Sequence, residues 1–312
     1  MNLLAQYKKL RGLMENSDNK QVSKAYLEVK RIERGIFTGN LSFVTMDSLF
    51  SWTKEWIKSF PESYDIIVGI PRSGLCVATI IALKLGKPLS TPEDFIKNKK
   101  WVSKTAIDRK IESVLLVDDS FTTGTTLTKQ LTALKKFNPN LKITTASLIV
   151  TPTTTSKVDL YYKIIPHPRL FEWNLLHAKK GKTVSDLDGV LCENCPQGIE
   201  GNEKQYLNWI KTAKPHLIPA FELDAIHSCR LEKYRQETEN WLEKNKVRYK
   251  KLILWNLPSK DQRNGKHAEY KITNLLKLKP DLVFESSSLE AKKIWAGTHI
   301  PVLCVDEMEL MG

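Results

Sequence analysis

VLLVDDSFTTGTT, the stretch from Val114 to Thr126, is the most informative segment of the sequence. Four aliphatic residues predict a buried strand, and two adjacent carboxylates follow where the strand ends. A turn rich in Thr and Gly then leads into a helical segment, so successive backbone N–H groups can point into the turn and bind phosphate. The carboxylates would repel phosphate and therefore suit sugar hydroxyls or Mg²⁺. The stretch predicts a sugar-phosphate site.

The segments around this stretch alternate between strand and helix. In the first half, strands are expected at 65–69, 114–117 and 144–150, and helices at 75–85 and 127–137. The alternation resumes after residue 183 and includes a helix expected at 231–244. Such alternation is typical of a parallel sheet flanked by helices on both faces. With a length that suits two domains, we expect two α/β domains at 1–180 and 181–312, each with a mainly parallel sheet.

The chain has 312 residues and a formal net charge of +13, with the excess in its first part. Residues 1–180 hold 28 Lys and Arg against 16 Asp and Glu, whereas residues 181–312 hold 20 against 19. Such a basic surface suits a polyphosphate substrate or a nucleic acid. No apolar run is long enough to span a bilayer, and the N-terminus does not resemble a signal peptide. We therefore expect a cytoplasmic protein without a membrane partner.

Two motifs of the first half together resemble a known family. The strand, the Asp-Asp pair and the TTGTT turn are similar to the phosphoribosyl pyrophosphate (PRPP) motif of type I phosphoribosyltransferases. The upstream segment DIIVGIPRSGLCVATIIALKLGKPL (65–89) is similar to the pyrophosphate loop of that family. The resemblance implies the type I phosphoribosyltransferase fold. It also implies transfer of ribosyl 5-phosphate from PRPP, with Mg²⁺, to a nitrogenous, nucleobase-like acceptor.

The roles that this resemblance implies fall on matching positions. Asp118 and Asp119 would hold the ribose 2′- and 3′-hydroxyls as the catalytic carboxylates. The 5′-phosphate would be held by the following turn, through Ser120, Thr122, Thr123, Gly124, Thr125 and Thr126. The pyrophosphate would be held by Pro71, Arg72, Ser73 and Gly74.

Two further segments are candidates for closing the site and for reading the acceptor. The Lys-rich segment 97–104 matches the position of the family's flexible catalytic loop and offers Lys100 and Lys104, although a solvated loop explains it equally well. Acceptor recognition would fall to the N-terminal segment or to residues 158–177, a candidate hood or junction. There Phe171 and Trp173 could stack on a ring while Asn174 reads its edge. The alternative, which we favour, is simple packing at the domain junction.

A second acidic turn begins the other domain. In VSDLDGVLC (184–192) a strand ends in Asp-x-Asp-Gly, which places two carboxylates on one side of a turn. The segment resembles motif one of the haloacid dehalogenase (HAD) superfamily, most of whose members are phosphatases. The resemblance makes Asp186 the nucleophile and Asp188 the general acid/base. Ser228 and Lys271 would bind the phosphoryl group, with Lys266 as the alternative to Lys271.

The fourth motif of that superfamily departs from its usual pattern. In FESSS, Glu285 is present, but Ser286 and Ser287 stand where a second acid is usual. Mg²⁺ could still be bound by Asp186, Asp188 and Glu285, with a backbone carbonyl and waters completing its shell. The alternative is a degenerate domain that binds phosphate or scaffolds the first half.

The cysteines offer a further, weaker pattern. Five cysteines in a long chain without a secretion signal indicate reduced thiols. Cys192 and Cys195 form a lone CxxC, which His227, Cys229 and Cys304 could complete as a Zn²⁺ site. Ordinary packing is the favoured interpretation, because no second CxxC or HxxxH pairs with the first.

We therefore expect a phosphoribosyltransferase with an appended HAD-like domain that dephosphorylates its product. The alternative is a bacterial stress or defence effector, or a PRPP or nucleotide sensor. It would bind nucleic acid or a nucleoprotein through its basic first domain and carry a degenerate second one. The sequence contains no recognition-helix or RNP-like signature for such binding. Homo-oligomerisation stays open.

Overall fold

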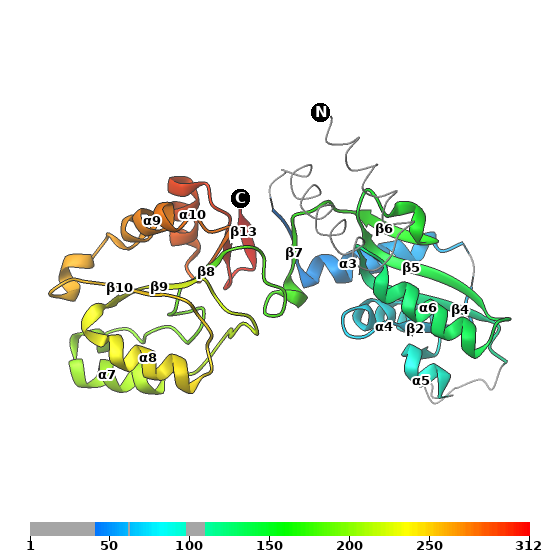
Figure 1. Cartoon of the computed structure of the whole chain (residues 1–312), viewed down its shortest axis with the longest axis horizontal. Coiled ribbons are helices and arrows are strands. Elements are labelled where there is room, and N and C mark those ends of the chain that lie inside the picture. The colour runs from blue at the N-terminus through cyan, green and yellow to red at the C-terminus, as the bar shows by residue number, and fades with distance from the viewer. Residues whose placement is uncertain (1–40, 62, 98–109) are drawn as a thin grey trace, which may run out of the picture. The chain divides into compact units, whose positions relative to one another are not determined.

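The computed structural model describes residues 41–61, 63–97 and 110–312 (Figure 1). The chain divides into two compact units, the first ending at Arg169 and the second beginning at Leu170. The domain boundary expected from the sequence, after residue 180, lies further along the chain than this division. No helix among these described residues is long and apolar enough to cross a membrane.

The first unit contains a five-stranded parallel sheet in the order β3-β2-β4-β5-β6. Its strands are β2 (Ile66–Gly69), β3 (Leu89–Ser90), β4 (Ser113–Phe121), β5 (Lys142–Val150) and β6 (Leu160–Ile164). The aliphatic runs of β2 and β4 are buried, as expected for strands covered on both faces. Parallel strands bring their carboxyl ends to one edge, and the turns after β2 and β4 lie there.

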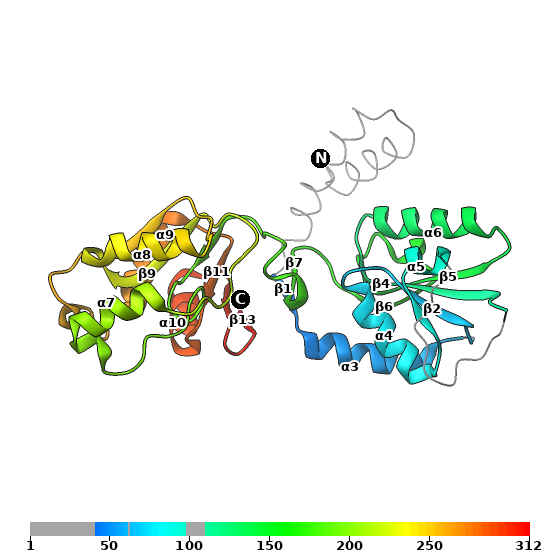
Figure 2. The same ribbon diagram turned by 90° about the horizontal axis from the view of Figure 1, so that it is seen from below.

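The described helices of this unit are α3 (Met46–Trp56), α4 (Gly74–Leu85), α5 (Pro92–Ile96) and α6 (Thr125–Phe137). Figure 2 shows α3 and α4 on one face of the sheet and α5 and α6 on the other. α4 is apolar through most of its length and ends at Gly86, which has a left-handed φ of 60°. α6 is amphipathic and turns Leu127 and Leu134 into the core.

The segment expected as a hood or junction, residues 158–177, is built from short elements. It contains β6, then β7 (Arg169–Phe171) and a 3₁₀ turn at Glu172–Asn174. β7 pairs with β1 (Ser42–Val44) in a separate two-stranded sheet.

The second unit contains a six-stranded sheet in the order β10-β9-β8-β11-β12-β13. Its strands are β8 (Thr183–Ser185), β9 (Ala225–Leu231), β10 (Leu252–Trp255), β11 (Leu282–Glu285), β12 (Val302–Cys304) and β13 (Glu309–Met311). β13 is antiparallel to β12, and the other pairs are parallel. Helices α7 (Glu203–Thr212) and α8 (Arg235–Lys244) cover one face, and α9 (His267–Leu278) and α10 (Ser288–Thr298) cover the other (Figure 1).

Both units are α/β with mainly parallel sheets between helices, which confirms this part of the expected fold class. The helix expected from Leu231 begins one residue later, with a 3₁₀ turn at Glu232–Tyr234 that leads into α8 at Arg235. Leu231 is buried and pairs with Trp255 of β10, so it is the last residue of β9 instead. Tertiary pairing overrides the helical pattern at this one residue.

Candidate functional site

The two sequence motifs of the first unit meet at the carboxyl edge of its sheet, where β2 and β4 are neighbours. Gly74 begins α4 and packs against the second motif. A Cβ at this position would lie 2.9 Å from the carbonyl oxygen of Val117 and 3.0 Å from Oδ1 of Asp118. Residues 71–73 precede it, exposed or half-buried, and the peptide bond between the first two is cis. Gly74, the last residue of the predicted pyrophosphate turn, thus lies against Asp118 of the acidic pair.

The acidic pair lies near the end of β4 in a largely buried setting. Asp119 is 7% exposed, and its backbone N–H donates to Oδ1 of Asp118 over 2.9 Å. Burial raises the pKa of Asp118 to about 8, and the negative charge of Asp119 adds to the shift. Ser120 follows in the same strand, half-buried. Sugar hydroxyls or a cation beside the pair would relieve this destabilisation of the charged form.

The Thr/Gly turn that follows has the geometry of an anion cradle. Gly124 has a φ of 77°, and a Cβ there would lie 2.2 Å from the ring of Phe121, so a larger residue does not fit. α6 begins at the next residue and supplies free N–H groups and the positive end of its dipole. Thr123, Thr125 and Thr126 are exposed, and the hydroxyls of the first two lie 3.1 Å apart.

A buried arginine that the sequence did not single out supports this turn. Nη2 of Arg169 donates to Oγ1 of Thr122 over 2.8 Å, and its Nη1 donates to the carbonyl of Ile165 over 2.9 Å. The hydroxyl of Thr154 also lies near the turn, 3.4 Å from the carbonyl oxygen of Phe121. The sequence signal for Arg169 was a single Arg in HPRLFEWNLLH, the aromatic and basic stretch at 167–177.

The remaining residues predicted for the transferase belong to neither of the two turns. Lys100 and Lys104 lie outside the described residues. Phe171 is buried and stacks on Trp173, with ring centroids 4.7 Å apart and an interplanar angle of 7°. Asn174 ends the adjacent 3₁₀ turn.

In the second unit a buried ion cluster forms around Lys271. Its Nζ lies 2.7 Å from Oδ2 of Asp186, 2.6 Å from Oε2 of Glu285 and 3.4 Å from Oε2 of Glu290. Burial raises the pKa of Asp186 to about 7 against the opposing effect of Lys271. Burial alone would lower the pKa of Lys271, but Asp186 and Glu285 raise it well above its ordinary value. The structure thus joins three residues that the HAD resemblance placed in different motifs.

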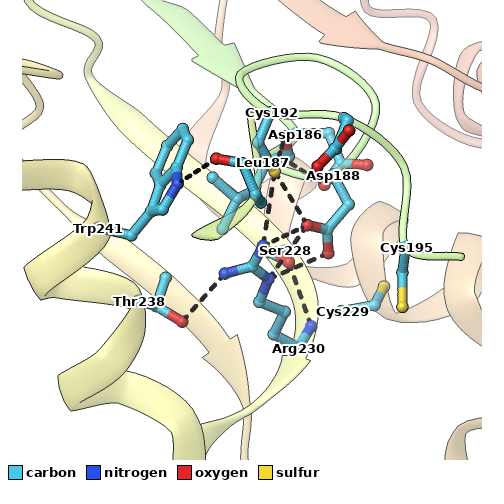
Figure 3. Close-up of polar contacts among 12 residues, drawn as sticks. Asp186, Leu187, Asp188, Cys192, Cys195, Ser228, Cys229, Arg230, Thr238 and Trp241 are labelled. Atoms are coloured by element: carbon cyan, nitrogen blue, oxygen red, sulfur yellow. Dashed lines mark hydrogen bonds and ion pairs between the residues drawn. The ribbon is translucent and has the colours of Figure 1, made fainter. Parts of the chain in front are cut away.

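Asp188 is held by a fully buried arginine, Arg230 (Figure 3). Nε of Arg230 donates to both carboxylate oxygens over 3.1 and 3.2 Å, and Nη2 donates to Oδ1 over 2.6 Å. The guanidinium also lies 4.8 Å from the ring centroid of Trp209, and the Sγ of Cys192 is 3.4 Å from Oδ1 of Asp188. Ser228 is buried beside them and accepts the backbone N–H of Arg230 over 3.1 Å. Sequence reasoning missed Arg230, two residues after the predicted Ser.

The carboxylates predicted to bind Mg²⁺ already accept N–H donors. Besides Lys271 and Arg230, backbone N–H groups take part: Oε1 of Glu285 accepts from Ser286 and Ser287 over 3.0 and 3.3 Å. A magnesium ion would have to share these oxygens with the present donors or displace them. Within the described ranges, no three His, Cys, Asp or Glu side chains are grouped to hold a metal ion.

The cysteines of the lone CxxC take part in packing and weak hydrogen bonds. Cys192 is buried, and Cys195 is half-buried with its Sγ 3.6 Å from the carbonyl oxygen of Pro196. All five cysteines of the chain are free thiols in the structure. Burial raises the pKa of Cys195 to about 12.

Comparison with known proteins assigns the first unit. The family model of the phosphoribosyl transferase domain matches residues 46–179, a range that contains both turns described above. These residues therefore form a phosphoribosyltransferase-type domain. The match spans less than half of the chain and ends before β8.

Solved structures with similarity to this domain include several phosphoribosyltransferases. The xanthine-guanine-hypoxanthine phosphoribosyltransferase of Helicobacter pylori is 17% identical, over 43% of this chain and 93% of that chain, with a TM-score of 0.34. A purine phosphoribosyltransferase of Pyrococcus horikoshii is 23% identical, over 43% and 95%, with a TM-score of 0.34. The orotate phosphoribosyltransferase of Aeropyrum pernix is 18% identical, over 42% and 73%, with a TM-score of 0.27. No curated protein sequence matches the chain.

Proposed function

We propose that the first unit transfers ribosyl 5-phosphate from PRPP to a nitrogenous, nucleobase-like acceptor and releases pyrophosphate. The observation that carries this proposal is the contact between Gly74 and Asp118. It places an acidic pair, a Thr/Gly cradle and a second turn at one sheet edge, and PRPP presents ribose hydroxyls, a 5′-phosphate and a pyrophosphate. The family match at residues 46–179 supports the same chemistry.

Each part of PRPP has a group of matching chemistry in this arrangement. Asp118 and Asp119 would accept hydrogen bonds from the ribose hydroxyls. The turn from Thr122 to Thr126, with Ser120 before it, would hold the 5′-phosphate through N–H and O–H donors. The turn 71–74 would hold the pyrophosphate. Mg²⁺ carried by PRPP would supply positive charge to the leaving group, and the raised pKa of Asp118 makes a cation near this pair favourable.

The proposed reaction exchanges one bond at C1 of the ribose. The lone pair of an acceptor nitrogen forms the new bond, while the C1–O bond breaks and its electron pair leaves with pyrophosphate. Positive charge develops on the ribose as that bond lengthens, and the carboxylates of Asp118 and Asp119 stabilise it electrostatically. Lys100 and Lys104 would add charge on the pyrophosphate side. Phe171, Trp173 and Asn174 remain candidates for acceptor binding.

For the second unit we propose a HAD-like phosphoesterase that removes the 5′-phosphate from the nucleotide-like product. Its support is the cluster of Asp186, Lys271 and Glu285 at the carboxyl edge of adjacent strands, with Ser228 on the next strand. Asp186 would attack phosphorus, the bond to the 5′-oxygen would break, and water would then hydrolyse the aspartyl phosphate. Transfer of a proton through Asp188 would use Oδ2, which accepts one hydrogen bond from Arg230 and has a second lone pair.

The test is release of pyrophosphate from Mg²⁺·PRPP in the presence of a small-molecule extract of the host cell. Wild-type protein should release it, Asp119→Asn should not, and Asp47→Asn, at an exposed acid of α3, should behave as wild type. In the same assay Asp186→Asn should abolish only the later release of inorganic phosphate. PRPP binding without turnover, together with salt-dependent binding of nucleic acid, would favour the effector or sensor hypothesis instead.

A further inference from the structure

We infer that Arg169 is a positioning residue for the phosphate end of the substrate, and that it acts through Thr122. This inference rests on the proposed PRPP site. Arg169 lies at the start of β7, outside both sequence motifs, and only 1% of its surface is exposed. It therefore cannot contact a ligand directly in this arrangement.

The guanidinium is fixed by several acceptors at once. Nη1 donates to the carbonyl oxygens of Ile165 and Val150, over 2.9 and 3.3 Å, which orients the plane of the group. Nη2 is then directed at Oγ1 of Thr122 over 2.8 Å. A planar fork of donors can satisfy acceptors on two sides in this way, whereas a lysine ammonium is a single point of charge.

This hydrogen bond determines what the Thr122 hydroxyl can offer to a ligand. A threonine hydroxyl has one proton to donate and can accept two hydrogen bonds. Because the oxygen of Thr122 accepts from Arg169, its own proton is available for a phosphate oxygen in the turn. The same bond fixes the side-chain rotamer of Thr122. Both effects favour an anion at the 5′-phosphate position.

The inference predicts different effects on binding at the two ends of the substrate. Ribose 5-phosphate should occupy the acidic pair and the Thr/Gly turn, whereas pyrophosphate should occupy the turn 71–74. Loss of Arg169 should therefore weaken binding of ribose 5-phosphate by about tenfold to a hundredfold, as for a lost hydrogen bond to a charged group. Binding of pyrophosphate should be unchanged.

The experiment is titration calorimetry of the full chain with each of these two ligands. Arg169→Met and Thr122→Val should each weaken ribose 5-phosphate binding, and the double variant should bind it no more weakly than Thr122→Val alone. Lys84→Met, which removes an exposed cation at the far end of α4, is the matched control and should leave both ligands unaffected. If Arg169→Met does not fold, Arg169→Lys carries the same comparison, because it keeps the charge but cannot reach the same three acceptors.

The outcomes distinguish this inference from the proposed function. If wild-type protein binds neither ligand, the proposal of a PRPP site is itself contradicted. A wild type that binds both, with variants at Arg169 that bind ribose 5-phosphate equally well, would overturn the role of Arg169 alone. Equal weakening of both ligands, with a lower melting temperature, would assign Arg169 a purely structural role.

Discussion

Arg230 holds the carboxylate of Asp188 in place: the arginine side chain is fully buried, and it donates three hydrogen bonds to the two carboxylate oxygens. The side chain of Asp188 is 26% exposed. A carboxylate fixed in this way can orient a ligand, and Oδ2, which accepts one hydrogen bond from Arg230, has a second lone pair that can take a proton. The pair with Arg230 therefore bears on how Asp188 could serve a phosphatase.

Replacement of Arg230 by Met should destabilise the protein by about 2–4 kcal/mol. The reason is that Asp188 would keep its charge while losing the donors to both oxygens, and its partial exposure offsets part of this loss. Urea unfolding followed by tryptophan fluorescence measures the effect. The double variant Arg230→Met/Asp188→Leu should recover part of the stability, since no unpaired charge remains. A double variant as unstable as the single one would show that the pair contributes little.

Lys271 should prove far more important for stability than an exposed lysine in an ion pair of similar length. Lys271→Met leaves the buried carboxylates of Asp186 and Glu285 facing each other, at an expected loss of about 3–5 kcal/mol. Lys233 lies 2.7 Å from Glu203, but both side chains are about half exposed or more. Lys233→Met should therefore change stability by less than about 1 kcal/mol. Equal losses of stability in the two variants, measured by thermal unfolding, would contradict the larger contribution expected from the buried cluster.

The sequence was sufficient to identify the two turns of the first unit and the strands that precede them. Aliphatic runs marked β2 and β4 as buried strands of a parallel sheet, but the contact between Gly74 and Asp118 came only from the structure. The supporting arginines could not be found in this way. Arg169 lies 47 residues from Thr122, and Arg230 lies 42 residues from Asp188. Such pairs depend on the register of distant strands, which local patterns do not encode.

The stability of the protein should fall with rising pH because of Asp118. Its pKa is raised to about 8 in the folded state, mainly by burial, and is about 4 in an unfolded chain. Between these values the folded state keeps a proton that the unfolded state has lost, so stability is full below about pH 4 and declines towards pH 8. Asp118→Asn cannot ionise and should be more stable than wild type at pH 8 by about 1–3 kcal/mol, with little difference at pH 4.

Urea unfolding at several pH values checks this expectation, with Asp47→Asn as the control for loss of an exposed carboxylate. Binding gives a second measure of the same group. PRPP should bind more tightly as pH rises from 6 to 8, with release of a proton, because sugar hydroxyls and a cation favour the ionised pair. A wild type and an Asp118→Asn variant with parallel stability curves would contradict the raised pKa.

Gly74→Ala tests the contact that joins the two motifs. The added Cβ would lie 2.9 Å from the carbonyl oxygen of Val117 and 3.0 Å from Oδ1 of Asp118, so the acidic pair or the start of α4 must shift. We expect a loss of about 1–3 kcal/mol of stability from this overpacking. We also expect at least about tenfold weaker PRPP binding, because about 1.4 kcal/mol of misplaced contacts suffices for that factor.

Gly86→Ala is the matched control: the added Cβ meets no atom within 4 Å, but the φ of 60° at this position is unfavourable for alanine. That variant should lose about 1–2 kcal/mol of stability and keep its affinity for PRPP. Equal losses of affinity in the two variants would mean that PRPP binding follows the stability of α4 rather than the contact between Gly74 and Asp118.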